Sequence, residues 1–358
     1  MQQFQCTTRL FFGADALEVL RQVEADHALI VTDRFFWENG TAQRIAAYLP
    51  DCECAFFTEV LPDPALRLIA KASAAFLDTG ATAIIALGGG SVLDCAKAVA
   101  YFAKTRPMLI VIPTTSGTGS EVTSFSILTH DGVKHPLVDD LLRPDWAILD
   151  ESLVASLPPS LIADSGMDLV SHAIEAIAAA NASPFTDALA IGALNTALKL
   201  LPGSFAGTTT HRGEVHAAAT MAGLAFDRAG LGACHALSHA LGGRFHVAHG
   251  RLNAVLLPAV MQLNQTAALE RYANAARACG ISYSNDQMAF RSLLQQLRQL
   301  RRSLNLPQTL AQAGIEPAKL AKYRAAVAQA AMEDPCMKTN PITPTVSQLE
   351  QLLQEISQ

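Results

Sequence analysis

The stretch TAIIALGGGSVLD, residues 82–94, joins a short apolar run to a helical pattern through three consecutive glycines. Residues 82–87 are typical of a buried strand, and residues 92–103 have the spacing and composition of a helix. Glycine at such a junction lets a ligand approach the backbone, and the free N–H groups at the start of a helix attract anions. The stretch therefore predicts a strand–turn–helix unit that either holds a phosphate group or is only a tight turn.

The alternation of strand and helix continues on both sides of this stretch. Further strands are predicted at residues 8–12, 28–33, 54–60, 108–112 and 146–150. Helices are predicted over residues 14–23, from 34 to 48, and over 64–78. Residues 125–129 and 134–138 flank a His-Asp-Gly turn and predict a hairpin. Strands that alternate with helices favour a parallel sheet covered on both faces.

After residue 158 the pattern changes. The sequence becomes rich in Ala, Leu and Gln with helical spacing, and Pro158-Pro159 is a plausible linker and helix start. We therefore predict two domains: an α/β domain over residues 1–158 and an all-helical domain over residues 159–358.

Composition excludes several classes of protein. Half of the 358 residues are apolar, only 16% are charged, and the net charge is −6 without a basic stripe. The densest basic cluster, Arg298 with Arg301 and Arg302, is expected to be one solvated helix face. Nucleic acid and anionic membranes are therefore unfavourable partners, and no apolar run reaches the roughly 18 residues of a membrane span.

The cysteines and the start of the chain indicate a reducing compartment. Seven cysteines with irregular spacing do not form a disulfide framework, and residues 1–5, MQQFQ, lack the basic start and apolar core of a secretion signal. We expect a cytoplasmic protein.

A second polar loop follows the predicted strand 108–112. Residues 113–121, PTTSGTGSE, contain five hydroxyl side chains and two glycines. Because open parallel sheets bind ligands at the carboxyl ends of neighbouring strands, this loop strengthens the prediction of a nucleotide site.

Asp33 is the last residue of the predicted strand 28–33, and its side chain has two interpretations. Its carboxylate could bind a ribose diol and favour NAD over NADP, or it could cap the helix that follows.

Histidines and an aspartate in the helical half have the spacing of a metal site. Asp168 and His172 are four residues apart, as are His235 and His239, so each pair lies on one face of a helix. Spacing alone pairs His235 with His239 as ligands, with His249 nearby. Such nitrogen and oxygen donors suit a divalent metal.

Other candidates are weaker by the same argument. Glu175 shares a helix with Asp168 and His172 but is expected to be rotated off their face, so it is given no ligand role. Three more histidines are expected at the surface or behind the site: His211, His216 and His246.

Four motifs together resemble the iron-dependent (group III) alcohol dehydrogenases over nearly the whole chain. They are Gly88-Gly89-Gly90-Ser91 with Asp94 and Lys97; residues 113–121; Gly166-Met167-Asp168 with His172 and Glu175; and His235–His239 with His249-Gly250. Within that family the chain is most similar to the propanol and ethanol dehydrogenases of propanediol and ethanolamine utilisation. It is shorter than many members near residues 104–108 and 202–212.

The resemblance implies a Rossmann-like domain followed by a helical one, the dehydroquinate synthase-like architecture, with the active site in the cleft between them. It implies a metal, usually Fe²⁺ with Zn²⁺ as the alternative, held by Asp168, His172, His235 and His249. His239 would then lie beside the metal without binding it and could pass a proton to solvent. The implied NAD-binding residues are Asp33, Gly88, Gly89, Gly90, Ser91, Asp94, Lys97, Thr114, Thr115, Ser116 and Thr118.

The predicted activity is hydride transfer between NAD(H) and a short-chain alcohol or aldehyde of the ethanol or 1-propanol type. One alternative is a glycerol dehydrogenase-like or other polyol oxidoreductase with a three-ligand zinc site on the same fold. A metal-stabilised scaffold without turnover is the alternative from another class. The resemblance also implies a homodimer or higher homo-oligomer, in the cytoplasm or inside a bacterial microcompartment.

Overall fold

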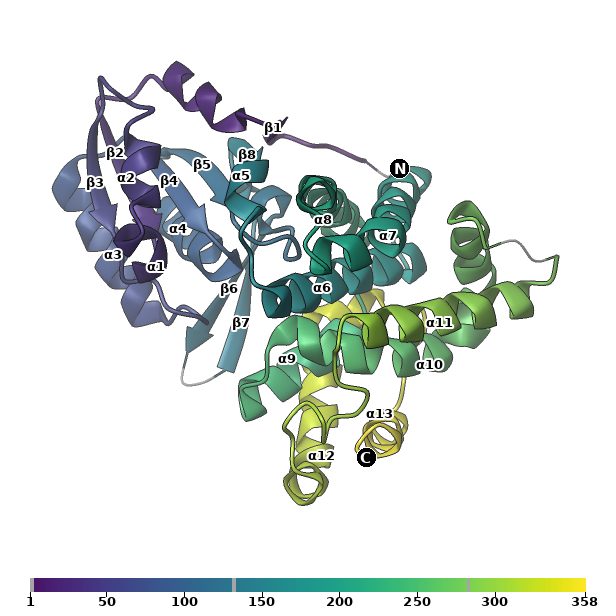
Figure 1. Cartoon of the computed structure of the whole chain (residues 1–358). Coiled ribbons are helices and arrows are strands. Elements are labelled where there is room, and N and C mark those ends of the chain that lie inside the picture. Colours follow the sequence, from purple (N-terminus) through teal and green to yellow (C-terminus); the bar gives the residue numbers. More distant parts are fainter. Residues whose placement is uncertain (1–2, 131–132, 282–283) are drawn as a thin grey trace. The chain divides into compact units, whose positions relative to one another are not determined.

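The computed structural model describes residues 3–130, 133–281 and 284–358. The chain divides into two compact units, Met1–Leu157 and Pro158–Gln358. Figure 1 shows strands flanked by helices in the first unit and helices throughout the second. The expected fold class is confirmed, because a parallel-sheet α/β unit is followed by a helical one.

Within the described residues, the first unit contains a six-stranded parallel sheet in the order β1-β8-β5-β4-β2-β3. Its strands are β1 (Arg9–Gly13), β2 (His27–Thr32), β3 (Glu53–Phe57), β4 (Ala83–Gly88), β5 (Met108–Pro113) and β8 (Trp146–Asp150). Every residue of β4 is buried, as expected for a central strand covered on both faces. Gly88 pairs with Pro113, so β4 and β5 end side by side.

Alternate residues of the central strands supply two separate cores. Ile84 and its neighbours pack against α3 (Leu66–Thr79) and α4 (Gly90–Phe102). Ile85 faces the opposite side, where the core includes residues of η1 (Ala16–Gln22) and α2 (Thr41–Ala46). The period-2 alternation of a strand explains why a continuous apolar run serves both faces.

Some predicted elements differ in detail. The predicted helix 14–23 is the 3₁₀ helix η1, and the pattern ending at residue 48 contains two short helices, α1 (Arg34–Glu38) and α2. Gly40, with φ of 80°, separates these two helices, because a left-handed residue ends the helical path. The unit also contains three short elements: α5 (Glu151–Val154), η2 (Ser120–Val122) and η3 (Asp140–Leu142).

The predicted hairpin is confirmed. β6 (Phe125–His130) and β7 (Val133–Val138) pair antiparallel, apart from the main sheet. Residues 131 and 132 of the predicted turn lie outside the described residues.

The second unit is helical. Its elements are α6 (Pro159–Ala178), α7 (Pro184–Phe205), α8 (Thr209–Ala229), α9 (Ala233–Phe245), α10 (His249–Ala278), α11 (Asp286–Ser303), α12 (Pro317–Glu333), η4 (Pro335–Thr339) and α13 (Val346–Glu355). α6 packs against α7, α8 and α10, and it is buried continuously from Gly166 to Ala178. Polar side chains in this part of α6 therefore need partners inside the protein.

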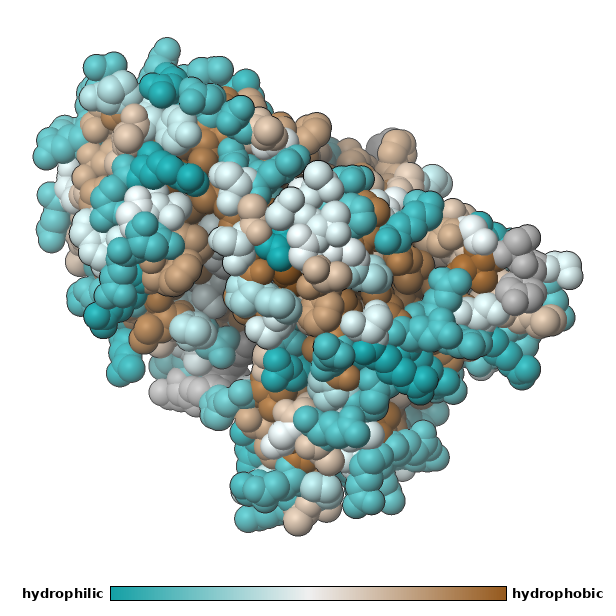
Figure 2. Space-filling view, viewed as in Figure 1, coloured by the Kyte–Doolittle hydropathy of each residue, from teal (hydrophilic) through white to brown (hydrophobic). Residues whose placement is uncertain are grey.

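The predicted solvated arginine face is only partly correct. Figure 2 shows a hydrophilic band along α11, and Arg302 is exposed. Arg301, however, is buried, and its guanidinium donates to the carbonyl of Ala254 (3.0 Å) and to Gln308 Oε1 (2.9 Å). Burial lowers the pKa of Arg301 to about 10. The clustered charges had suggested a solvated face, but one arginine joins α11 to α10.

The cysteines and helix α7 bear on the expected compartment and on the absence of a predicted membrane span. Among the described residues, the cysteines form no disulfide bond. Of the helices described, α7 is the one long and apolar enough to cross a membrane by length and composition, and it packs against α6 and α8 of its own unit.

Candidate metal centre and nucleotide loops

The two polar loops of the first unit lie in contact at the ends of β4 and β5. Thr114 N donates to the carbonyl of Gly88 (3.0 Å). A Cβ added to Gly90 would lie 2.9 Å from the methyl carbon of Thr118, and one added to Gly89 would lie 3.3 Å from that of Thr115. The glycines therefore leave the space that the hydroxyl-rich loop fills.

Asp94 and Lys97, both on α4, form hydrogen bonds with the hydroxyl-rich loop 113–121 and with the residues that follow it. Asp94 accepts from Ser120 Oγ (2.8 Å) and from Ile127 N (3.1 Å). Lys97 is fully buried, and its Nζ donates to the carbonyls of Ser120 (2.9 Å) and Thr123 (2.8 Å). A buried ammonium needs such acceptors. Any effect of these two side chains on a bound nucleotide would therefore pass through the loop.

Asp33 caps a helix. Its Oδ1 accepts from Phe36 N at 3.1 Å, at the start of α1. The capping interpretation is confirmed, and a contact with a ribose stays a prediction.

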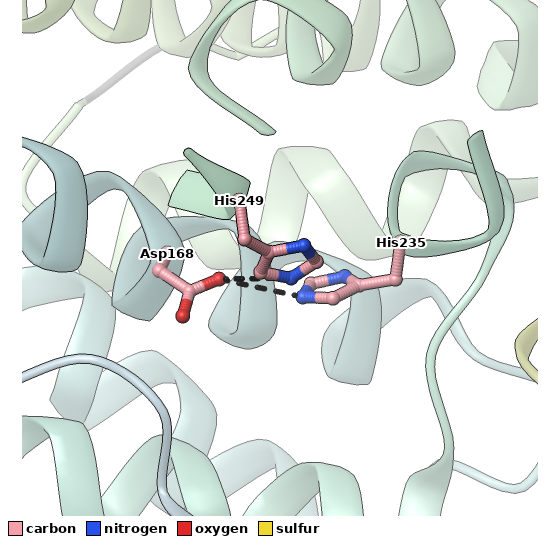
Figure 3. Close-up of side chains that lie close together, drawn as sticks. All are labelled: Asp168, His235 and His249. Carbon is pink, nitrogen blue, oxygen red and sulfur yellow. Dashed lines mark ion pairs between the residues drawn. The ribbon is translucent and has the colours of Figure 1, made fainter. Parts of the chain in front are cut away.

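Three of the four predicted metal ligands converge in the second unit. Figure 3 shows Asp168, His235 and His249 pointing toward one another from α6, α9 and the start of α10. Asp168 Oδ1 lies 3.6 Å from His235 Nε2 and 3.5 Å from His249 Nε2. Ligand atoms around one ion with bonds near 2.1 Å are about 3.4 Å apart. The three atoms therefore have the spacing of a metal site.

His172 lies one turn along α6 from Asp168. Its Nε2 is 3.9 Å from Asp168 Oδ1, and its ring stacks between His235 (centroids 4.5 Å apart) and Phe226 (4.2 Å). Three imidazoles and one carboxylate are a donor set that suits Fe²⁺ or Zn²⁺, so the residues fit the metal that the resemblance implies.

His239, which spacing alone had paired with His235, belongs to a different group. Its ring stacks on His249 with centroids 5.1 Å apart, but its Nδ1 forms a hydrogen bond with Asp334 Oδ2 at 2.9 Å. Among the described residues, two groups of side chains have ligand atoms close enough to share a metal: Asp168, His235 and His249; and His239, Asp334 and Cys336.

Glu175 has a role that the sequence analysis missed. Its carboxylate forms a 2.6 Å hydrogen bond with His235 Nδ1 and accepts from the backbone N of Cys234 (2.8 Å). The expectation that Glu175 is rotated off the face of Asp168 was wrong, because seven residues span almost two full helical turns. The spacing 168, 172 and 175 was the signal that could have found it. Glu175 turns Nε2 of His235 toward Asp168.

Two further side chains contact the predicted ligands. Ser238 Oγ lies 3.0 Å from His249 Nδ1. Asn253 Nδ2 donates to Asp168 Oδ1 (2.8 Å) and lies 3.3 Å from His235 Nε2 and 3.2 Å from His249 Nε2. Each stands three or four residues after a ligand histidine, on the same helix face, which is the signal that the sequence offered.

The ionisable groups of the centre shift one another's pKa values. Burial would raise the pKa of Asp168, but the imidazoles of His172, His249 and His235 hold it well below the usual range. Burial would lower the pKa of His235, but its hydrogen bonds to Asp168 and Glu175 raise it to about 9. The raised pKa of His235 shows that its carboxylate neighbours stabilise positive charge, as a cation site must, and the lowered pKa of Asp168 keeps that carboxylate ionised.

The weaker histidine candidates stay apart from this centre. His216 is buried on α8, His211 is half-buried on the same helix, and His246 is exposed after α9. None of the three joins a potential metal group within the described residues.

A parallel sheet with two such loops and a helical unit with a three-histidine, one-carboxylate centre are the features expected of a metal-dependent, nucleotide-linked oxidoreductase. The chain belongs to the iron-containing alcohol dehydrogenase family. Residues 7–151 match the model for iron-containing alcohol dehydrogenase, and residues 162–357 match the C-terminal model for the Fe-containing alcohol dehydrogenase family. The resemblance inferred from the motifs is confirmed, and the chain is an oxidoreductase of this family.

Individual relatives agree with this placement. The chain is 37% identical to 1-propanol dehydrogenase PduQ of Citrobacter freundii over 99% of its length and 100% of the relative. It is 32% identical to NADPH-dependent butanol dehydrogenase of Clostridium saccharobutylicum, covering 95% and 94% of the two chains. The structure of an iron-containing alcohol dehydrogenase from Thermococcus thioreducens superposes with a TM-score of 0.92 at 32% identity, over 99% of each chain.

Gly250→Ala should disrupt the metal centre. A Cβ at Gly250 would lie 1.9 Å from the backbone carbonyl oxygen of Asp164 and 3.2 Å from Asp168 Cβ. The start of α10 must therefore move away from α6 and carry His249 with it. We expect metal occupancy to fall sharply and stability to drop by about 1–3 kcal/mol. Metal analysis by mass spectrometry and thermal unfolding measure the two effects.

Gly242→Ala is the matched control, because a Cβ there meets no atom closer than 3.6 Å. This variant should keep its metal and its stability. A fully loaded Gly250→Ala protein would contradict the close approach of α10 to α6.

Proposed function

We propose that this enzyme is a metal-dependent alcohol dehydrogenase and aldehyde reductase that transfers hydride between NAD(H) and a short-chain alcohol or aldehyde, of the ethanol or 1-propanol type. The convergence of Asp168, His235 and His249, with His172 stacked on His235, is the observation that carries the proposal. The names of the 1-propanol and butanol dehydrogenase relatives support a short aliphatic substrate.

Asp168, His172, His235 and His249 would hold a divalent metal, with Fe²⁺ as the first choice and Zn²⁺ as the alternative. A metal bound there supplies Lewis acidity that lowers the pKa of an alcohol hydroxyl and polarises an aldehyde carbonyl. The residues around the ligands fix their orientation, since Glu175 holds His235 and Ser238 lies against His249. The burial of Asp168, His172 and His235 strengthens these interactions.

The loops of the first unit would bind the dinucleotide. Backbone N–H groups at the start of α4 suit its pyrophosphate, and the residues proposed to hold it are Gly88, Gly89, Gly90 and Ser91. The hydroxyl-rich loop would face the nicotinamide side through Thr114, Thr115, Ser116 and Thr118. Asp94 and Lys97 would contribute by holding that loop in shape.

Asp33 would set the preference for NAD. Its Oδ1 is used by the helix cap, so a ribose diol would be bound through the other carboxylate oxygen. One relative is named as NADPH-dependent, which makes the choice of cofactor a property to be tested for this chain.

A polyol oxidoreductase of the glycerol dehydrogenase type is the second candidate. The observation that favours it is the tight group of three ligands, because His172 Nε2 lies 3.9 Å from Asp168 Oδ1 whereas His235 and His249 lie closer. A three-ligand zinc site would use such a group.

For its setting, we propose a homodimer or higher homo-oligomer in the cytoplasm, with enclosure in a bacterial microcompartment as the alternative. The resemblance to propanediol and ethanolamine utilisation enzymes supports this setting. We expect neither nucleic acid nor a membrane as a partner.

The first prediction concerns the reaction. After anaerobic loading with Fe²⁺, the protein should reduce C2 to C4 aldehydes with NADH. The reaction is measured as the loss of NADH absorbance at 340 nm. Glycerol oxidation on the same preparation separates the two candidates. No turnover with any of these aldehydes, at measured full metal occupancy, would contradict the proposal.

The second prediction concerns the cofactor. Asp33→Asn keeps a side chain that can cap α1 but removes the charge that would repel a 2′-phosphate. The ratio of kcat/KM for NADH over NADPH should fall by about tenfold, which corresponds to about 1.4 kcal/mol. An unchanged ratio, with unchanged stability, would mean that Asp33 acts only as a cap.

The third prediction separates the ligands from their neighbour. His235→Ala and His249→Ala should each lose metal and nearly all activity, because a site missing one ligand holds a labile ion poorly. His239→Ala should keep most of its metal yet turn over more slowly. If His239→Ala lost its metal and His249→Ala kept it, the result would contradict this assignment. It would instead favour His235 and His239 as the ligand pair, as their helical spacing alone indicates.

A further inference from the structure

His239 is held by a carboxylate far along the chain. Its Nδ1 lies 2.9 Å from Asp334 Oδ2, and the two residues are separated by 95 positions. Asp334 follows the end of α12, and its side chain is 14% exposed. The other oxygen, Oδ1, accepts from Cys336 N at 2.8 Å and caps η4. One oxygen is thus anchored to the backbone while the other faces the imidazole, so the carboxylate cannot rotate freely.

This contact determines which nitrogen of His239 carries the proton. A carboxylate accepts hydrogen bonds only, so the neutral ring must place its hydrogen on Nδ1 and its lone pair on Nε2. The ring is also stacked on His249, with an interplanar angle of 15°. His239 is therefore fixed in orientation and in tautomer, beside a proposed metal ligand.

The carboxylate stays ionised at physiological pH. Burial would raise the pKa of Asp334, but the hydrogen bond and charge of His239, with the N–H of Cys336, lower it to about 2. Such an anion is the partner that holds a catalytic histidine in one tautomer in other enzymes.

A second metal site is the competing interpretation of the same residues, since ligand atoms of His239, Asp334 and Cys336 lie within 4.8 Å of one another. Two facts disfavour it. Asp334 already accepts from an imidazole and from a backbone N–H. Burial and the charge of Asp334 raise the pKa of the Cys336 thiol well above its usual value, so the thiol is a poor ligand.

We propose that Asp334 is a positioning residue that holds His239 as its Nδ1–H tautomer, leaving Nε2 to exchange a proton with the alcohol or with water. The catalytic part of this inference rests on the proposed alcohol dehydrogenase function, whereas the tautomer is a property of the protein without metal or substrate.

Asp334→Asn tests the tautomer directly. The amide oxygen should stay on the N–H of Cys336, which needs an acceptor, and the NH₂ group should then face His239 Nδ1. That donor forces the hydrogen onto Nε2. In the metal-free protein labelled with ¹⁵N-histidine, NMR should show Nδ1–H for His239 in the wild type and Nε2–H in the variant. The His239→Ala spectrum assigns the signals.

Turnover should follow the tautomer. With metal occupancy and the KM for NADH unchanged, kcat of Asp334→Asn should fall by about 10²-fold or more, the usual contribution of a proton-transfer group. The double variant Asp334→Asn/His239→Ala should be no slower than His239→Ala alone, because the two residues act as one unit.

Asp187→Asn is the matched control, since Asp187 pairs with Arg271 (2.7 Å) on other helices of the same unit. It should change neither the tautomer of His239 nor kcat. If Asp334→Asn does not fold, Asp334→Ser keeps a side chain that can cap η4 but removes the contact with the imidazole. His239 in this variant should lose its Nδ1–H preference.

Several results would overturn the inference. An Nε2–H tautomer in the wild type, or no change of tautomer in the Asp334 variants, would remove the positioning role. A changed tautomer with unchanged kcat would remove its catalytic importance. A second equivalent of Co²⁺ that binds the wild type but not Cys336→Ser would make the three residues a metal site. An inactive wild type with the predicted tautomers would count against the proposed function and leave the positioning role in place.

Discussion

The buried carboxylate of Glu175 is the contact on which the arrangement of the helical unit depends. It accepts from the backbone N–H of Cys234 and from Nδ1 of His235, so one side chain of α6 both caps α9 and orients a proposed metal ligand. The start of α9 has no side-chain cap of its own. A Cβ at Gly232 would lie 2.5 Å from Asn340 Oδ1 and 2.8 Å from Glu175 Oε1, which explains why the residue before α9 is glycine. Removing one partner from a buried pair of this kind costs about 3–5 kcal/mol.

Two other histidines around the centre also have an oxygen atom facing their Nδ1, as His235 does. Nδ1 of His235 faces Glu175, Nδ1 of His249 faces Ser238, and Nδ1 of His239 faces Asp334. With Nδ1 occupied, Nε2 is the nitrogen left for a metal or a proton. We therefore infer that the side-chain oxygens of Glu175, Ser238 and Asp334, which orient the imidazoles, matter to the chemistry of the centre as much as the histidines do. These supports come from α6, α9 and the turn after α12, which makes the packing of the unit part of the site.

Much of the fold could be predicted from the sequence because its strands are apolar runs bounded by glycine, proline and polar residues. β8 and the hairpin β6–β7 lie where those patterns placed them. The break at Gly40 was missed, since a single glycine inside a helical pattern has several outcomes. Arg301 was placed on the surface because charge alone does not show which side of α11 is covered.

The candidate site was less accessible to local patterns. Helical spacing paired His235 with His239, and the resemblance to a family was needed to bring in His249, which the structure places beside Asp168. Glu175 was within reach of helix geometry but was assigned the wrong face. Asp334 carried no local signal, because 95 residues separate it from His239 and only tertiary packing brings them together.

X-ray absorption spectroscopy of the Fe²⁺-loaded protein tests the metal centre most directly. We expect a coordination sphere of nitrogen and oxygen atoms only, with the outer scattering of three imidazoles and bonds near 2.0–2.2 Å. A sulfur scatterer at about 2.3 Å would contradict it, because the metal would then lie with Cys336 rather than with Asp168.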